Sequence, residues 1–201
     1  MVRAGLVLAL ALLQSTATAP RFDGDRAFSH LRRLVAFGPR PAGSPAIEQS
    51  RRYIRSELTA LGLPVAEHRW DAVTPTGRVP MVNLAATLPG DSPDRIVIAG
   101  HYDTKRFDDI RFVGANDGGS SAAFLLELAR ALQGRRRPLT IELLFLDGEE
   151  AVVEWGGTDR VYGSRRYVDE ARRTGTLAGL KALVLVDMIA DRDLEIRRDM
   201  N

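Results

Sequence analysis

The chain has 201 residues, of which 45% are hydrophobic and 27% charged, with no cysteine and a formal net charge of only +2. This balance is typical of one globular domain, and it excludes disulfides, cysteine nucleophiles and thiolate metal ligands. We also expect no nucleic-acid binding, because that function needs many basic residues on one face. The one arginine tract, at 135–137, is predicted to be a solvent-exposed loop.

The first 19 residues differ in character from the rest. Arg3 precedes an apolar run at 6–13, and a small-x-small site at 17–19 precedes Pro20. This arrangement predicts a signal peptide over 1–19 and an exported domain, secreted or periplasmic, over 20–201. A membrane anchor is the alternative, but the run is well short of the roughly 20 residues that a spanning helix needs. We therefore expect no stable membrane insertion. Amino-terminal sequencing of exported protein should give a mature N-terminus at or near Pro20.

Apolar periodicity predicts the elements that follow. Helices are expected over 25–37 and 46–61, and strands over 65–73 and 79–88. Short apolar runs at 96–99, 141–146 and 183–186 predict three buried strands, with helices at 120–132 and 167–173 between them. This alternation indicates an α/β fold with an open, mostly parallel mixed sheet flanked by helices. No helix closes the pattern after the third run, so we expect the domain to be truncated at its C-terminus.

Acidic and imidazole residues follow each of the three apolar runs. His101 and Asp103 follow the first, Glu149 and Glu150 the second, and Asp187 the third. The carboxyl ends of parallel strands meet at one edge of a sheet, where α/β proteins place their active sites. These side chains are therefore expected to lie together.

Asp117 lies in a glycine-rich loop just before the helix expected at 120. Without the other acidic residues, Asp117 would be interpreted as the N-cap of that helix. The Glu149–Glu150 pair by itself would likewise be interpreted as part of a solvent-exposed surface. So many carboxylates in one crevice would repel one another, and a divalent cation removes that conflict. Imidazole with carboxylate oxygens suits a catalytic zinc site, and this donor set includes His101.

The two adjacent glutamates are expected to have different tasks. Glu149 and Glu150 cannot point the same way at the end of a strand, so one can bind the metal while the other moves protons. Asp103 is placed to orient the His101 imidazole, although a turn residue is the alternative. The chain has no Gly-x-Ser-x-Gly elbow, which argues against a serine triad.

Four motifs in order carry a resemblance to a known family. The stretches at 101–105, 112–117, 125–132 and 147–151 resemble the zinc aminopeptidase superfamily, metallopeptidase family twenty-eight. Trp155, Asp159 and the Tyr-Gly-Ser-Arg run at 162–165 are similar to its glutaminyl-peptide cyclotransferase branch. Ordinary aminopeptidases of the superfamily usually lack this tryptophan-containing insert. The resemblance covers residues 26–190.

The resemblance implies roles for particular residues. It implies that Asp117 and Glu150 ligate zinc, that Glu149 is the acid/base and that Asp187 is its partner. It also implies that Trp155 lines the substrate pocket. The cyclases would use one zinc ion, whereas in the aminopeptidases the positions of His101 and Asp187 would hold a second.

Three positions depart from the animal cyclases. Gly100 and Ala122 stand where those enzymes carry a cysteine pair, and Gly118 stands where they carry serine after the bridging aspartate. The last zinc ligand of the family, a histidine, is expected beyond residue 201.

Three functions remain open at the level of sequence. The leading hypothesis is a cyclase that acts on peptides with a free N-terminal glutamine. The second is a zinc aminopeptidase that hydrolyses N-terminal residues. The third is a non-catalytic binding domain that has kept the fold, although every ligand position within the sequenced span is present.

Overall fold

The computed structural model describes residues 20–196, so the expected signal peptide at 1–19 lies outside the described residues. The elements, in chain order, are α1 (Gly24–Ala36), α2 (Pro45–Ala60), β1 (Val65–Thr74), β2 (Gly77–Leu88), β3 (Ser92–His101), the π-turn η1 (Ala115–Gly119), α3 (Ser120–Ala131), β4 (Leu139–Leu146), α4 (Tyr162–Arg173), the short 3₁₀ turn η2 (Thr176–Gly179) and β5 (Leu180–Leu185).

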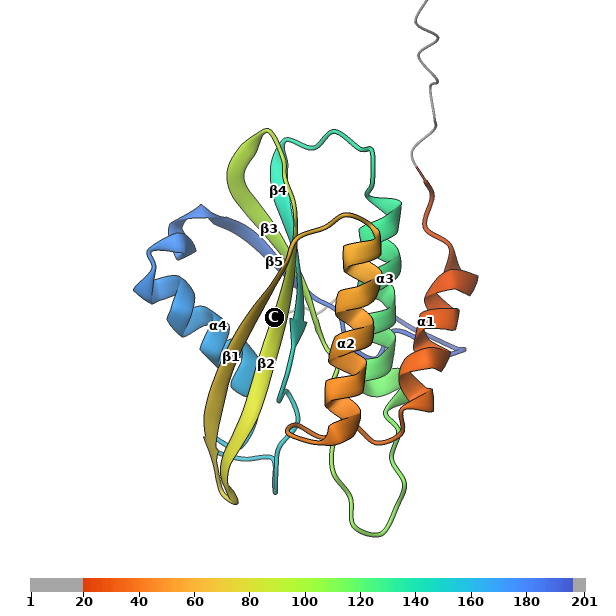
Figure 1. The fold of residues 1–201 in the computed structure, drawn as a ribbon, viewed down its shortest axis with the longest axis vertical. Helices are drawn as coiled ribbons and strands as arrows, with labels where there is room; N and C mark the ends of the chain where they lie inside the picture. Colours follow the sequence, from red (N-terminus) through yellow and green to blue (C-terminus); the bar gives the residue numbers. More distant parts are fainter. Residues whose placement is uncertain (1–19, 197–201) are drawn as a thin grey trace, which may run out of the picture.

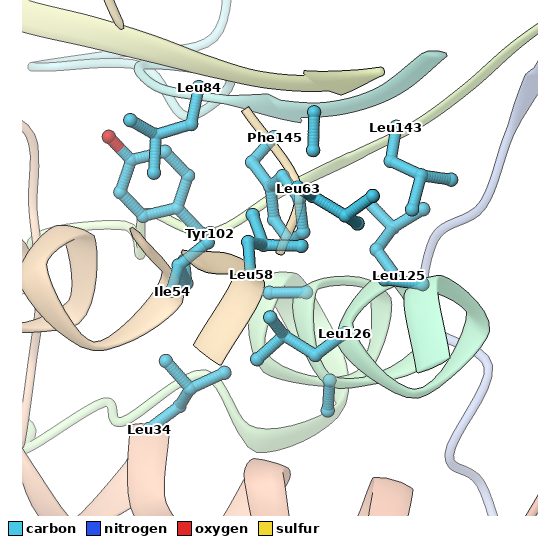
Figure 2. Close-up of a cluster of buried hydrophobic side chains, with 14 of the residues drawn as sticks. Leu34, Ile54, Leu58, Leu63, Leu84, Tyr102, Leu125, Leu126, Leu143 and Phe145 are labelled. Atoms are coloured by element: carbon cyan, nitrogen blue, oxygen red, sulfur yellow. The ribbon is translucent and has the colours of Figure 1, made fainter. Parts of the chain in front are cut away.

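Five strands form one open sheet between two layers of helices (Figure 1). The helices α1, α2 and α3 lie on one face, and α4 lies on the other. Figure 2 shows the larger core, in which aliphatic side chains of α2 and α3 meet Tyr102 and Phe145 beneath the sheet. A smaller cluster that includes Val97 and Leu144 packs on the α4 side. Because helices cover both faces, the inner strands carry apolar side chains on both sides, as in the Leu143–Leu146 part of β4.

The strand order is β1-β2-β4-β3-β5. β3 pairs in parallel with both β4 and β5, whereas the β1–β2 hairpin is antiparallel and joins β4 in the antiparallel sense. The expected fold class, an open mixed α/β sheet flanked by helices, is confirmed, but the sheet is not mostly parallel, because the β1–β2 and β2–β4 pairings are antiparallel. Because β3, β4 and β5 run the same way, their carboxyl ends meet at one edge, which is where the expected site residues begin.

The helices begin and end where local chemistry favours it. Asp23 caps α1 by accepting hydrogen bonds from the backbone N–H groups of Asp25 and Arg26. Ser44 caps α2 in the same way, with a proline at the first helical position. α2 ends before Gly62, whose φ of +74° is the left-handed conformation that favours glycine.

The third apolar run is a strand but is not buried as expected. Among the described residues β5 pairs only with β3, and the side chains of Leu183, Val184 and Leu185 are 49%, 50% and 60% exposed. Apolar character predicts burial only when another element covers the strand, and β5 lies at the edge of the sheet within the part of the chain that the structure describes. Its parallel pairing, which sets the position of Asp187, is as expected.

None of the helices within 20–196 combines the length and the apolar character needed to cross a lipid bilayer.

Candidate functional site

The three parallel strands deliver the expected side chains to one edge of the sheet. β3 ends at His101, and the turn after β4 carries Glu149 and Glu150. The pairing of β5 with β3 continues one residue beyond the strand, because the Val186 N–H donates to the carbonyl of Ala99 at 2.8 Å. This hydrogen bond places the next residue, Asp187, beside the His101 imidazole.

His101 lies at the centre of the group and is only 2% exposed. Its Nε2 atom lies 3.1 Å from a carboxylate oxygen of Asp117 and 3.3 Å from one of Asp187. Its Nδ1 atom lies 3.3 Å from Asp103 and 3.9 Å from Glu149. Residues from four separate segments of the chain therefore converge on one imidazole.

Asp117 lies inside the short segment η1 rather than at a helix cap, and its own backbone there is extended, with φ −82° and ψ 112°. The residue before α3 that acts as its cap is Gly119, without a side-chain hydrogen bond, so the N-cap alternative for Asp117 does not hold. The following residue, Gly118, has a φ of +76°, and a Cβ there would lie 2.3 Å from the carbonyl oxygen of Asp103. A serine at this position would need the backbone to move, so the glycine is matched to this turn.

A buried arginine, Arg40, is hydrogen-bonded to the backbone that leads into η1. Arg40 is fully buried, and its guanidinium donates to the backbone carbonyls of Tyr102, Val113 and Gly114 at 3.0, 2.6 and 3.0 Å. Burial lowers the pKa of Arg40 to about 10, an effect opposed by nearby carboxylates, so it stays charged at neutral pH. None of the sequence motifs points to Arg40. The sequence feature that could have drawn attention to it is its position between two prolines in the loop before α2.

Asp103 has a double structural task. One of its carboxylate oxygens faces the His101 imidazole, and the two oxygens accept the backbone N–H groups of Glu149 and Glu150, each at 3.1 Å. It is fully buried. The expectation that Asp103 orients the imidazole agrees with this geometry. Its hydrogen bonds to the backbone of Glu149 and Glu150 were not expected from the sequence.

The site is electrostatically crowded. Burial raises the pKa of Glu149 to about 7; His101 opposes this, and Asp103, Glu150 and Asp187 reinforce it. Burial likewise raises the pKa of Glu150, with Asp117 among the charges that raise it further. Burial alone lowers the pKa of His101, but its hydrogen bonds to three aspartates raise it well above its usual value. The carboxylates around His101 thus favour a positive charge at this position.

Part of this group has the spacing of a metal site. One ligand atom each from His101, Asp117 and Asp187 lies within 4.8 Å of the others. A nitrogen and two carboxylate oxygens form a donor set that suits zinc, and a divalent cation would relieve the repulsion among the carboxylates. The residues therefore fit a metal ion.

The group opens onto a cavity of about 480 Å³. Trp155, which is 47% exposed, forms part of its wall, and its indole N–H donates to a carboxylate oxygen of Glu150 at 3.1 Å. The cavity is lined by Lys105, Phe107, Phe112, Asp117, Glu149, Glu150, Trp155, Asp187 and Met188. A larger cavity, about 580 Å³, lies between α4 and the sheet and contains none of the expected site residues. Of the six expected site residues, five line the smaller cavity, and the sixth, His101, lies buried against them.

Asp147 follows β4 directly but does not join the site. Its carboxylate is fully buried, accepts hydrogen bonds from Arg51 at 3.0 Å and from the backbone N–H of Val82 at 2.8 Å, and lies 3.2 Å from the hydroxyl of Tyr102. Burial, with help from Asp103, raises the pKa of Asp147 to about 7. Its neighbours make it a structural support for the strand end.

Asp159 holds the segment that follows the glutamate pair. Burial alone raises its pKa, but hydrogen bonds from the Tyr162 hydroxyl and from the N–H groups of Val153, Glu154 and Val152 lower it below its ordinary value of 3.8. The carboxylate therefore stabilises the fold fully above pH 3.8, and this contribution is lost as the pH falls through the lowered pKa.

We expect Asp159→Asn to lower the free energy of unfolding at pH 7 by about 1–3 kcal/mol, the cost of leaving buried donors unsatisfied. The difference from the wild type should shrink as the pH falls from 3.8 through the lowered pKa of Asp159, because below that pKa both proteins carry a neutral side chain. Urea titrations at several pH values measure this. Asp169→Asn, an exposed position on α4, is the matched control. A difference that stayed constant with pH would contradict the assignment.

Comparison with known proteins agrees with this geometry. The glutaminyl-peptide cyclotransferase-like protein of Bos taurus is 35% identical over 166 residues, which are 77% of this chain and 43% of that protein. The crystal structure of Acidobacteriales bacterium glutaminyl cyclase superposes with a TM-score of 0.85 and 38% identity, covering 92% of this chain and 65% of that one. The leucine aminopeptidase precursor from Bacteroides thetaiotaomicron superposes with a TM-score of 0.74 and 26% identity, covering 88% and 66%. The chain thus spans less than half the length of the curated relative and about two thirds of the solved structures.

The family model for peptidase family M28 matches residues 83–198, which is more than half of the chain and contains every expected site residue. The motifs, the sheet edge that gathers them and this match together establish that the chain belongs to peptidase family M28.

Proposed function

We propose that this chain carries the catalytic site of a zinc-dependent glutaminyl-peptide cyclotransferase. The reaction converts an N-terminal glutamine to pyroglutamate with release of ammonia. The observation that supports it most directly is the contact of Trp155 with Glu150 at 3.1 Å, in a cavity that also contains Glu149 and Asp187. An apolar ring beside the acid/base and the metal ligands suits a small amide side chain.

Asp117 and Glu150 are the proposed zinc ligands, with His101 beside them. A bound zinc ion supplies Lewis-acid polarisation of the side-chain amide carbonyl. Burial raises the pKa of Glu150 and the Asp117 carboxylate raises it further, which supports the assignment because it indicates two carboxylates close enough to share one cation.

Glu149 is the proposed acid/base. The α-amine of the substrate forms a new bond to its own side-chain carbonyl carbon and loses one proton, which Glu149 accepts. The bond from that carbon to the amide nitrogen then breaks, and Glu149 returns the proton so that ammonia leaves. A carboxyl group whose pKa lies at about 7 can both accept and donate a proton near neutral pH. Asp187 is its proposed partner, positioned through His101.

A second function uses the same residues. The compact group of His101, Asp117 and Asp187 is where an aminopeptidase would hold another zinc ion. In that case Glu149 would deprotonate a water molecule, and the whole N-terminal residue would be released.

Mass spectrometry of a peptide that begins with glutamine separates the two. We expect the protein at its natural length, supplied with zinc, to produce a peptide lighter by one ammonia with every peptide bond intact. The same sequence beginning with leucine is the control and should remain unchanged. Loss of the entire first residue from either peptide would establish the aminopeptidase and refute the cyclase.

We also propose that the mature protein is exported, with peptides that have a free N-terminus as its substrates. The support for export is the pattern in residues 1–19, and amino-terminal sequencing of exported protein tests it.

A further inference from the structure

The segment between the glutamate pair and α4 is a loop closed at its neck. It contains no helix or strand, and it carries Trp155. At the neck the Val161 N–H donates to the carbonyl of Glu149, and the Tyr162 N–H donates to the carbonyl of Gly148, each at 2.8 Å. The loop therefore begins at the glutamate pair, and its far end is hydrogen-bonded back to the backbone at Gly148 and Glu149.

Inside this loop the Asp159 carboxylate accepts four hydrogen bonds. It is 7% exposed. One oxygen accepts the N–H of Val152 at 2.9 Å and the hydroxyl of Tyr162 at 2.6 Å. The other accepts the N–H groups of Val153 at 2.8 Å and Glu154 at 3.0 Å. Three consecutive backbone amides, ending just before Trp155, are thus fixed by one carboxylate.

A cation holds the opposite side of the same backbone. The Lys105 ammonium donates to the carbonyls of Ala151 at 2.6 Å and Val153 at 2.7 Å. The amides of this segment face a negative charge and its carbonyls face a positive one, so the peptide dipoles favour both. Charge-assisted hydrogen bonds of this kind are stronger than neutral ones.

The Trp155 ring itself has few other supports. It is 47% exposed, its N–H reaches Glu150, and the Arg160 guanidinium lies 5.7 Å from the ring centroid. A half-exposed ring depends on its backbone for its position. We infer that Asp159 is a positioning residue that fixes Trp155 against Glu150 and thereby shapes the pocket for the glutamine side chain. The role in the pocket rests on the proposed function, whereas the positioning of the ring can be tested without it.

Asp159→Asn is the central variant. Asparagine has nearly the same size, but its amide nitrogen cannot accept the backbone N–H groups. We expect KM for glutaminyl peptides to rise roughly tenfold, about the loss of one charge-assisted hydrogen bond, with kcat changed much less. Glu154→Gln is the matched control: it removes one negative charge from the same loop at an exposed side chain and leaves the backbone N–H in place. It should leave KM unchanged.

A double-mutant comparison separates positioning from a general structural role. Trp155→Ala should also raise KM, and adding Asp159→Asn to it should raise KM no further, because the ring that Asp159 positions is gone. Additive effects of the two changes, or a fall in kcat with KM unchanged, would overturn the inference.

Fluorescence supplies a readout that does not depend on activity. The chain has two tryptophans, so Trp70→Phe leaves Trp155 as the only indole. In that background Asp159→Asn should increase acrylamide quenching and shift the emission to the red, while Glu154→Gln should do neither. Unchanged quenching in the Asp159 variant would refute the positioning role. A protein that releases no ammonia but shows the quenching change would refute the proposed function alone.

Tyr162→Phe covers the case in which Asp159→Asn does not fold. It removes only the hydroxyl that donates to Asp159 and keeps the three backbone donors. We expect smaller increases in KM and in quenching, and an unchanged protein on both measures would count against the inference.

Discussion

Glu149→Gln is expected to lower kcat for ammonia release by roughly 10²–10⁴-fold, the usual contribution of a positioned acid/base. Glutamine has almost the same shape as glutamate but cannot accept the proton of the attacking amine at neutral pH. The backbone N–H of residue 149 should still bond to Asp103, so the turn that carries Glu150 should keep its geometry. Zinc content should therefore equal that of the wild type.

Single-turnover kinetics on a glutaminyl peptide and elemental analysis of the same sample make this measurement. Glu154→Gln, five residues along and exposed, carries the same chemical change outside the cavity and should retain full kcat. A Glu149→Gln protein with nearly normal kcat would assign the proton transfer to another group. One that had also lost its zinc would show that Glu149 is a ligand.

Asp117→Ala is expected to lower zinc affinity by more than about 100-fold, because removal of a direct ligand should cost at least as much as loss of a supporting residue. The site offers few replacement donors, since His101 and Asp187 already face one another at 3.3 Å. Ammonia release should fall with the metal content. The π-turn should persist, because its backbone is held by Arg40 and by the glycine at 118.

Zinc content after dialysis and a zinc titration with a competing chelator measure the effect. Asp109→Ala is the matched control: it removes an exposed carboxylate from the neighbouring loop, outside the cavity lining. Equal zinc content in the Asp117 variant and the wild type would remove Asp117 from the ligand set. Activity lost with zinc retained would leave it only a role in orienting substrate.

Some features of this protein follow from local pattern alone. Apolar spacing predicts every helix and strand of 20–196 to within a few residues, apart from the first turn of α4 and the two short turns η1 and η2. The alternation of strands and helices predicts parallel strands whose carboxyl ends share an edge. That single topological consequence brings His101, Glu149 and Asp187 together although they are far apart in the sequence.

Other features depend on contacts that no local pattern contains. Asp147 and Glu149 are two residues apart, yet one is paired with Arg51 in the core and the other lines the cavity. In sequence Asp103 has a turn residue as its alternative and Asp159 stands out only through the family resemblance. The structural roles of both come from the backbone N–H groups that the folded chain presents to them.

Local pattern thus predicts the elements, their order and the set of chemically active side chains, because periodicity indicates which positions face a core. The folded arrangement is needed to tell which carboxylates line the cavity, which pack behind it and which strand lies at an edge. A buried charge is stable only with a partner, and that partner usually comes from a distant segment of the chain.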